Sequence, residues 1–192
     1  MQQPSGKLVI ISGPSGAGKT TIVRQVFTRL PSLCRSISAT TRDPRPGEQE
    51  GVDYYFLSDA EFARRRQNGE FLECCEVFGK GIWYGTLESE VTPRLALGKW
   101  VVLEIDVQGT KAVVCKYPGA VTVFVRPDSM EELERRLRSR GTESEEAIHR
   151  RLTVARQEWA SAHLYQRQVV NDDVERAVTE LCQFLQQSGV QT

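Results

Sequence analysis

Short apolar runs alternate with stretches of helical periodicity along this chain of 192 residues. Three runs are apolar and rich in β-branched residues, which predicts strands buried on both faces; they cover residues 8–12, 100–106 and 121–126. The residue composition also predicts strands at 36–41, 52–57, within 70–86 and at 168–171.

Helical periodicity fills much of the remaining chain. Apolar residues at helical spacing follow residue 20, and an amphipathic helix is predicted between residues 174 and 185. A further helix is predicted over residues 89–97. Three other helix starts are predicted where a hydroxyl residue is followed three positions later by glutamate, at Ser58, Ser129 and Thr142.

The first apolar run leads into a glycine-rich segment, residues 13–20, that fits the phosphate-loop pattern G-x-x-x-x-G-K-[ST]. Glycines let successive backbone N–H groups turn toward phosphate oxygens, and a helix N-terminus adds partial positive charge. Lys19 can reach the β- and γ-phosphates, and the Thr20 hydroxyl can ligate Mg²⁺. Since strand, loop and helix follow in the order that the motif requires, a chance glycine-rich turn is the weaker interpretation.

Acidic residues at the end of the run 100–106 extend this interpretation, because such an acid in a phosphate-loop site holds Mg²⁺ or its water shell. Alternating strands and helices predict an α/β fold, in which a parallel β-sheet core containing the phosphate loop is flanked by helices. Ligands of such a sheet are expected beyond the carboxyl ends of its strands.

Composition and charge narrow the function classes. The chain has 25 Lys and Arg against 25 Asp and Glu, so the formal net charge gives no electrostatic case for nucleic acid or an anionic membrane as partner. No apolar run approaches the roughly 18 residues of a membrane span, and the first residues lack the apolar region of a secretion signal. We therefore expect a cytoplasmic protein, monomeric or homodimeric.

The five cysteines are expected to be reduced thiols. Their number is odd, and they form no C-x-x-C pair or zinc-ligand spacing. We expect most of them to be small core residues, with a redox role as the less favoured alternative.

Two groups of arginines are open to two interpretations each. Arg42 and Arg45 lie in a polar segment with two prolines, which is either a solvated surface loop or a clamp for a phosphate. The segment from 135 to 151 carries six arginines, which either form a solvated helix face paired with glutamates or belong to a flap that closes over a transferring phosphate.

The whole chain, from about residue 8 to 187, resembles the guanylate kinase family, whose members move a phosphoryl group from ATP to GMP. The resemblance rests on an ordered set of motifs: GPSGAGKT at 13–20, SATTRDPRPGE at 38–48, GVDYYF at 51–56, GEFLE at 69–73, WYGT at 83–86, LEIDVQG at 103–109, RGTE at 140–143 and VNDD at 170–173. A phosphate loop alone would leave many enzymes open, whereas the full set in this order is specific.

This resemblance implies a single domain over residues 1–192 with three parts. The core would cover 1–37, 97–126 and 159–192, a GMP-binding insert 38–96, and a helical lid 127–158. By resemblance, the GMP phosphate would be held by Arg42, Arg45, Tyr54 and Tyr84, and the guanine would be read by Ser38, Glu73, Thr86 and Asp106. Beside these matches, the phosphate clamp becomes the favoured interpretation of Arg42 and Arg45.

The same resemblance assigns the donor side. ATP would be bound by the loop residues Gly13, Pro14, Ser15, Gly16, Ala17, Gly18, Lys19, Thr20 and Thr21, with Asn171 near the adenine. Arg136, Arg140 and Arg151 match lid arginines that contact ATP phosphates, and with Lys19 and Arg42 they are the expected catalytic residues. Mg²⁺ is the expected cofactor, with Thr20 and Glu104 as its metal-site residues, Glu104 acting directly or through water.

The predicted reaction is in-line transfer of the γ-phosphoryl group of ATP to GMP, and to dGMP, in purine nucleotide metabolism. One alternative is a related phosphate-loop kinase with a sugar-phosphate acceptor, but Glu73 and Thr86 argue against it, because a sugar phosphate has no guanine edge to read. The other is a non-catalytic guanylate kinase-like binding module, in which an intact phosphate loop would be unusual.

Overall fold

The computed structural model describes residues 6–77, 81–139 and 144–191. The chain divides into two compact units, which are described separately below. The first comprises Met1–Leu8, Cys34–Leu103 and Gln108–Ala120, and the second comprises Val9–Leu33, Glu104–Val107 and Val121–Thr192. Arg140, a predicted catalytic residue, lies outside the described residues.

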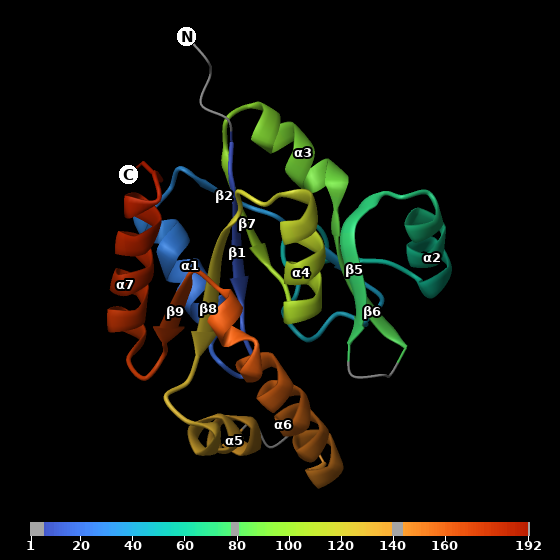
Figure 1. The fold of residues 1–192 in the computed structure, drawn as a ribbon. Coiled ribbons are helices and arrows are strands. Elements are labelled where there is room, and N and C mark those ends of the chain that lie inside the picture. Colours follow the sequence, from blue (N-terminus) through green and yellow to red (C-terminus); the bar gives the residue numbers. More distant parts are fainter. Residues whose placement is uncertain (1–5, 78–80, 140–143, 192) are drawn as a thin grey trace. The chain divides into compact units, whose positions relative to one another are not determined.

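Parallel strands form the sheet of the second unit: β1 (Leu8–Ser12), β8 (Val121–Arg126) and β9 (Arg167–Val170). β8 lies between the other two (Figure 1), with Ile11 opposite Val123 and Val125 opposite Val169. All four side chains are buried. Burial on both faces explains why the runs 8–12 and 121–126 are apolar without alternation.

The helices of this unit are amphipathic. α1 (Lys19–Arg29) and α7 (Val174–Gln187) pack against each other (Figure 1). α7 buries Val178, Leu181 and Leu185 at helical spacing. α5 (Met130–Ser139) and α6 (Glu145–Ala160) share their own apolar cluster of Leu133, Leu137, Ile148, Leu152 and Ala155.

Two of the three predicted caps are confirmed. The hydroxyls of Ser58 and Ser129 accept hydrogen bonds from the backbone N–H groups of Glu61 at 3.2 Å and Glu132 at 3.1 Å. The third prediction was wrong in its residue: α6 begins after Ser144, whose hydroxyl accepts the N–H of Ala147 at 3.3 Å. Thr142 lies outside the described residues.

The first unit contains a four-stranded sheet with the order β4-β3-β6-β5. β3 (Ser38–Thr40) pairs parallel with β4 (Tyr55–Phe56) and antiparallel with β6 (Ile82–Leu87), which pairs antiparallel with β5 (Phe71–Val77). The register places Ser38 and Glu73 on either side of Thr86. The predicted strand 52–57 is shorter than expected, because β4 covers only residues 55 and 56, and Tyr54 forms an isolated bridge with Glu50.

Helices α2 (Asp59–Gln67) and α3 (Glu88–Ala96) belong to the same unit. α2 stacks Phe62 on Phe71 of β5, with ring centroids 4.4 Å apart, in a cluster completed by Ala39 and Leu87. β6 carries Gly85 at the point of closest packing, where a Cβ would lie 2.8 Å from the Phe71 ring and 2.9 Å from the Glu73 carbonyl oxygen. The glycine therefore lets β5 and β6 hold this spacing beside Glu73.

β7 (Trp100–Glu104) was predicted, whereas β2 (Leu33–Arg35) and α4 (Val107–Lys116) were not. The Val101 N–H donates to the Lys7 carbonyl at 2.9 Å, and the Ser36 N–H to that of Val102 at 3.1 Å. A glycine and several β-branched residues give α4 low helix propensity, so burial of residues such as Val113 decides its conformation.

The predicted fold class is confirmed: the chain is α/β, with a parallel-strand sheet and flanking helices. All five cysteines are free thiols, but the expectation that most lie in the core was wrong, since Cys182 is the one that is buried. No described helix combines the length and apolar character needed to cross a membrane.

Candidate active site

The phosphate loop depends on its glycines for close backbone contacts. Gly13, Gly16 and Gly18 have φ values of 136°, 95° and 86°, a region that favours glycine. A Cβ at Gly13 would lie 1.9 Å from the Val125 carbonyl oxygen, and one at Gly18 would lie 2.3 Å from Asn171 Nδ2. The loop thus packs directly on β8 and on the residue that follows β9, and it ends at Lys19, the first residue of α1.

Lys19 folds back over this loop. Its Nζ donates to the carbonyl oxygens of Gly13 at 2.5 Å and Pro14 at 3.0 Å. Burial lowers the pKa of Lys19, while the charges of Glu158, Glu104 and Asp106 act in the opposite direction. The ammonium is therefore held at the loop by backbone acceptors, with three carboxylates in its surroundings.

A hydroxyl and a carboxylate meet at the start of α1. Thr20 Oγ1 lies 3.5 Å from Glu104 Oε2, at the carboxyl end of β7. Oxygen ligands of these two kinds suit Mg²⁺, which takes few protein ligands when nucleotide phosphates supply others. The described residues contain no group of three or more acidic, histidine or cysteine side chains arranged to hold a metal alone. The residues present fit a metal that is shared with a nucleotide.

Glu158, on α6, is a carboxylate of this site that the sequence analysis did not identify. Burial raises the pKa of Glu158 to about 7. The charge of Lys19 acts to lower this pKa, and the charge of Asp106 acts to raise it. A signal existed in the sequence, because Glu158 continues the apolar helical spacing of Ile148, Leu152 and Ala155. An acid on the buried stripe of a helix needs a polar or charged neighbour.

Asn171 and Arg136 connect the loop to the end of β9 and to α5. Asn171 is buried, and its Nδ2 donates to the Ala17 carbonyl at 2.7 Å. Its Oδ1 has no hydrogen-bond partner within the described ranges. Arg136 donates to the Asn171 carbonyl at 2.7 Å and to Glu132 at 2.7 Å. Two predicted donor-side residues therefore lie at the phosphate loop.

The arginines of α5 and α6 differ in their surroundings. Arg135 has an exposed side-chain fraction of 72% and pairs with Glu132, and Arg138 pairs with Glu134 and Glu145. These two fit the interpretation of a solvated, ion-paired face, whereas Arg136, at 25% exposed, contacts the residue beside the loop.

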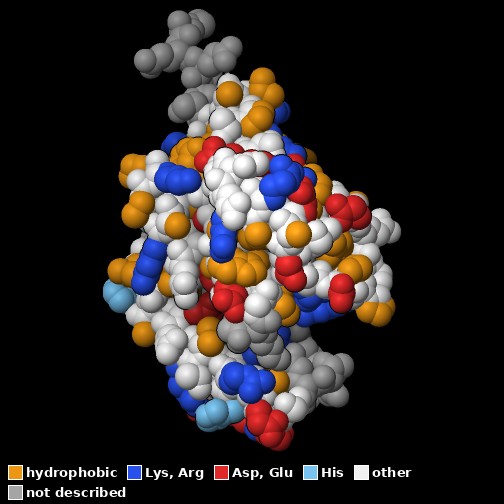
Figure 2. Space-filling model, turned by 90° about the vertical axis from the view of Figure 1, so that its right-hand side faces the viewer, with side chains coloured by type: hydrophobic (Ala, Val, Ile, Leu, Met, Phe, Trp, Pro, Cys, Tyr) orange, Lys and Arg blue, Asp and Glu red, His pale blue; other side chains and the backbone are white. Residues whose placement is uncertain are grey.

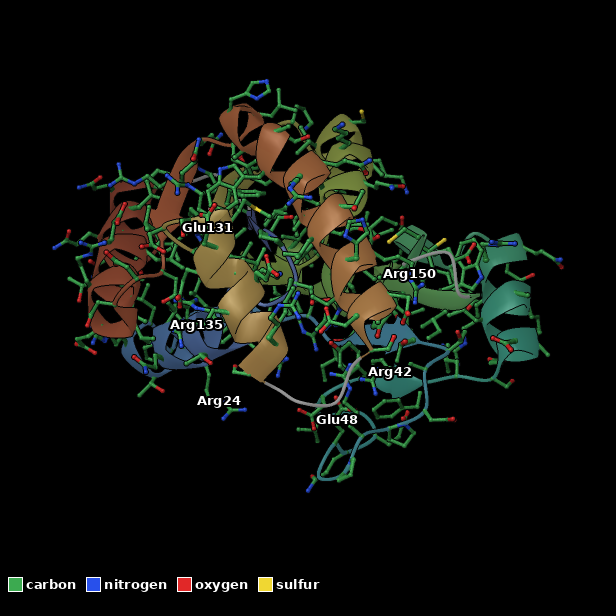
Figure 3. The ribbon with its side chains drawn as sticks, turned by 90° about the horizontal axis from the view of Figure 1, so that it is seen from below. Arg24, Arg42, Glu48, Glu131, Arg135 and Arg150 are labelled. Atoms are coloured by element: carbon green, nitrogen blue, oxygen red, sulfur yellow. The ribbon has the colours of Figure 1, made fainter. Side chains whose placement is uncertain are left out.

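Figure 3 labels Glu131 and Arg135 on α5 and Arg150 on α6. Arg151 is half-buried on α6.

In the first unit, a buried pair links β5 and β6. The Thr86 hydroxyl donates to Glu73 Oε1 at 2.7 Å, and the two residues are 1% and 7% exposed. Ser38 is opposite Thr86 in the register of β3 and β6. Three of the four predicted guanine-reading residues thus lie together. The fourth, Asp106, belongs to the second unit, near Lys19.

Arg42 is held from several sides in this unit. Its Nε donates to the Tyr84 hydroxyl at 3.1 Å, and its guanidinium lies 5.5 Å from the Tyr54 ring centroid. Nη2 donates to both carboxylate oxygens of Glu48 at 3.0 Å (Figure 3). Partial burial acts to lower the pKa of Arg42, but the hydrogen bonds to Tyr84 and Glu48 raise it overall. The structure brings Arg42, Tyr54 and Tyr84 together.

Glu48 is a further residue of this group that sequence reasoning passed over, although it belongs to the motif at 38–48. Its Oε2 also accepts the backbone N–H of Arg45 at 2.7 Å, so one carboxylate organises the loop around both predicted clamp residues. The Arg45 side chain itself is exposed.

A phosphate loop between a buried parallel strand and a helix, with a lysine, a hydroxyl and acids at its end, defines the chain as a protein of the phosphate-loop nucleotide-binding class. A family model described as guanylate kinase matches residues 5–188. The chain therefore belongs to the guanylate kinase family, and it is an enzyme of that family.

Individual relatives agree with this assignment. A guanylate kinase of Rhodopirellula baltica is 56% identical over 182 residues, which cover 94% of this chain and 87% of the relative. One of Gloeobacter violaceus is 53% identical over 91% of this chain and 84% of its own length. Among solved structures, guanylate kinase from Anaplasma phagocytophilum matches with a TM-score of 0.78 at 30% identity, covering 98% of this chain and 89% of that one.

Proposed function

We propose that this chain transfers the γ-phosphoryl group of ATP to GMP or dGMP, giving ADP and GDP or dGDP. The observation that carries the choice of acceptor is the buried Glu73–Thr86 pair of 2.7 Å. Guanine presents N1–H and N2–H₂ as adjacent donors, and a carboxylate can accept from both. Adenine lacks this donor pair and would give the buried carboxylate no donors from the base, a discrimination of about 10⁴-fold.

The acceptor phosphate would be held by Arg42, Arg45, Tyr54 and Tyr84. Two arginines and two tyrosine hydroxyls can surround a phosphate with donors, and three of these residues already contact one another. Ser38 and Asp106 would complete the contacts to the base. A phosphate oxygen of GMP is ionised at neutral pH, so the reaction needs no general base, and the work is positioning and charge neutralisation.

On the donor side, residues 13–21 would bind the ATP phosphates, and Lys19 would move from the loop carbonyls to the β- and γ-oxygens. Arg136, Arg140 and Arg151 would neutralise charge that develops on the transferring group. The free Oδ1 of Asn171 could accept from the adenine amino group. Thr20 and Glu104 would hold Mg²⁺, which when bound neutralises phosphate charge.

We also propose the division into core, GMP-binding insert (38–96) and lid (127–158), with closure that excludes water from the transferring phosphate. A cytoplasmic location is proposed because the five thiols are free and the substrates are nucleotides. Acidic and basic side chains alternate over the face shown in Figure 2, which supports small-molecule substrates rather than a nucleic acid or membrane partner.

The test of this proposal is ADP release with ATP and Mg²⁺ and each of GMP, dGMP, AMP, CMP, UMP and a ribose phosphate as acceptor. We expect GMP and dGMP to be preferred by at least about 10³-fold in kcat/KM. A preference for AMP or CMP would overturn the acceptor assignment. Turnover with a sugar phosphate alone would favour the related-kinase alternative, and nucleotide binding without turnover would favour the binding module.

A further inference from the structure

Glu90, on α3, is a buried carboxylate that the proposed reaction does not use. It is 8% exposed, and each of its oxygens is engaged. Oε1 accepts the Tyr55 hydroxyl at 3.0 Å, and Oε2 accepts the backbone N–H of Ile37 at 3.2 Å and Arg94 Nη1 at 2.7 Å. All four residues belong to the first unit.

The partners of Glu90 come from three separate parts of this unit. Arg94 is one turn further along α3, so its pair with Glu90 is an ordinary i,i+4 contact of a helix. Ile37 and Tyr55 are 53 and 35 residues away in sequence. Helix stability alone does not account for those two bonds, because they reach across the unit to the starts of β3 and β4.

The positions of these two partners matter for the acceptor site. Ile37 directly precedes Ser38, a proposed contact to the base, and Tyr55 directly follows Tyr54, a proposed contact to the acceptor phosphate. The Glu90 carboxylate therefore fixes Ile37 and Tyr55, each of which is one residue away from a proposed substrate contact. α3 itself follows directly on β6, which carries Tyr84 and Thr86.

The charge of Glu90 suits this task. Burial acts to raise its pKa, but the donors Arg94, Ile37 and Tyr55 lower it overall, so the carboxylate is ionised at neutral pH. Burial and the bond to Glu90 raise the pKa of Tyr55, so its hydroxyl keeps the proton that it donates. An ionised acceptor makes stronger hydrogen bonds than a neutral one.

We propose that Glu90 is a positioning residue for the acceptor nucleotide, which holds Ser38 and Tyr54 in register by binding their neighbours Ile37 and Tyr55. The inference rests on the acceptor site proposed above. It assigns Glu90 no contact with substrate, and its effect is confined to acceptor binding.

The test compares Glu90→Gln with a control on the same helix. Glutamine has nearly the same size as glutamate, but an amide NH₂ group replaces one of the two carboxylate oxygens. This group is a donor and would face other donors. We expect KM for GMP to rise about tenfold, the loss of one hydrogen bond to a charged group, with kcat and KM for ATP within about twofold. Glu88→Gln, which removes an exposed carboxylate 3.5 Å from Lys116, should leave all three constants unchanged.

Tyr55→Phe provides a second, milder variant that removes one donor and leaves Glu90 in place. It should raise KM for GMP in the same direction, and combining it with Glu90→Gln should add less than the two separate effects, because both act on one bond. If Glu90→Gln does not fold, as judged by circular dichroism and thermal unfolding, the Tyr55→Phe result decides.

An unchanged KM for GMP in the folded variants overturns the inference, and so does a parallel loss in KM for GMP, KM for ATP and kcat, which would indicate a general structural role. The wild-type acceptor panel separates this failure from that of the proposed function. If the wild type prefers another nucleotide, the acceptor assignment fails, whatever the Glu90 variants do. If it prefers GMP and the variants are normal, Glu90 positioning alone fails.

Discussion

At the scale of single residues, the donor site concentrates opposite charges around one lysine. Lys19 lies at the phosphate loop with Glu104, Asp106 and Glu158 in its surroundings, and its Nζ is held by two loop carbonyls. In the proposed reaction, the ammonium would exchange these neutral acceptors for the charged oxygens of a polyphosphate, so its contribution would increase as charge develops.

The first prediction follows from this arrangement. Lys19→Met keeps an unbranched side chain one atom shorter and removes its charge, so turnover with ATP and GMP should fall at least about 10³-fold, by analogy with other phosphate-stabilising cations. The far-ultraviolet circular dichroism spectrum and the unfolding midpoint should stay close to those of the wild type. Near-normal kcat in a folded Lys19→Met protein would contradict the proposed role.

Glu158 carries a prediction about pH. Its pKa is raised to about 7 in the folded protein from an ordinary value of 4.5, so between these values the folded state binds more protons than the unfolded state. The free energy of unfolding therefore falls as pH rises through this window, and the part due to Glu158 is lost above pH 7. Glu158→Gln cannot lose a proton, so relative to the wild type it should be more stable at pH 8 than at pH 5.

The expected change in this difference is about 2 kcal/mol, less than the full pKa shift would give, because Glu158 retains some solvent contact. Urea unfolding of both proteins at pH 5 and pH 8 measures it. Parallel pH profiles for wild type and Glu158→Gln would show that the carboxyl titrates normally. Thr153→Ala, an exposed position of the same helix, controls for substitution on α6.

The sequence predicted individual site residues unevenly, for a physical reason. Glu73 and Thr86 were named as site residues through the family resemblance, because both lie in motifs that carry it, whereas the hydrogen bond between them was not predicted. Glu158, Glu90 and the partner of Arg42, Glu48, were not predicted, since each acts through where its side chain points. Helical periodicity could have placed Glu158 on the buried side of α6, but the partners of all three carboxylates depend on tertiary packing, which periodicity does not encode.

At the scale of elements, the arginine side chains of α5 point in different directions. The helix turns about 100° per residue, so neighbouring arginines face different surroundings. Arg136 reaches the carbonyl of Asn171, whereas Arg135 projects toward solvent and pairs with Glu132. The number of arginines in the sequence did not distinguish the two interpretations. Arg135 fits the solvated, ion-paired face, and a role of Arg136 in a flap over the transferring phosphate stays a prediction.

This difference makes Arg135 a matched control for Arg136. Arg136→Ala should lower kcat about 10²- to 10³-fold if it neutralises charge on the transferring group, whereas Arg135→Ala should change kcat by less than about twofold, as expected for an exposed ion pair. Steady-state kinetics of the two variants at saturating ATP and GMP decide the question. Equal losses in both variants would assign the effect to the helix rather than to Arg136.

Elements with strong patterns were predicted well, and those stabilised mainly by tertiary contacts were not. β1, β8 and α7 follow from uninterrupted apolar runs or clear helical spacing. α4 has a sequence that disfavours a helix, and the three-residue strand β2 is too short to produce a pattern. Strand β1 and the phosphate loop that follows it, on which the proposed donor site depends, were among the well-predicted elements.

At the scale of the whole molecule, the two proposed substrate sites draw most of their residues from different units of the chain. Lys19 and the phosphate loop belong to the second unit, and the Glu73–Thr86 pair to the first. A ligand stabilises a protein according to its own concentration and dissociation constant. Each nucleotide should therefore raise the unfolding temperature independently, and each unit can be inactivated separately.

The corresponding prediction is that each of two variants loses the thermal stabilisation by one nucleotide and keeps the stabilisation by the other. Glu73→Gln should lose most of the GMP-induced increase in unfolding temperature and keep that of a non-hydrolysable ATP analogue, and Lys19→Met should show the reverse. At 100 times the dissociation constant, a ligand adds about 2.7 kcal/mol, which is several degrees for a chain of this size. Loss of both shifts in either variant would argue against separable sites.

Both carboxylate oxygens of Glu48 accept from Nη2 of Arg42, one of the proposed ligands of the acceptor phosphate. If Arg42 binds the acceptor phosphate as proposed, this binding would exchange one anion for another at its guanidinium. Free inorganic phosphate, which brings no further contacts, gains little from such an exchange, whereas a nucleotide that also engages Glu73 through its base can compensate for the displaced ion pair. The resting ion pair would thus keep the pocket available in a cell rich in small anions.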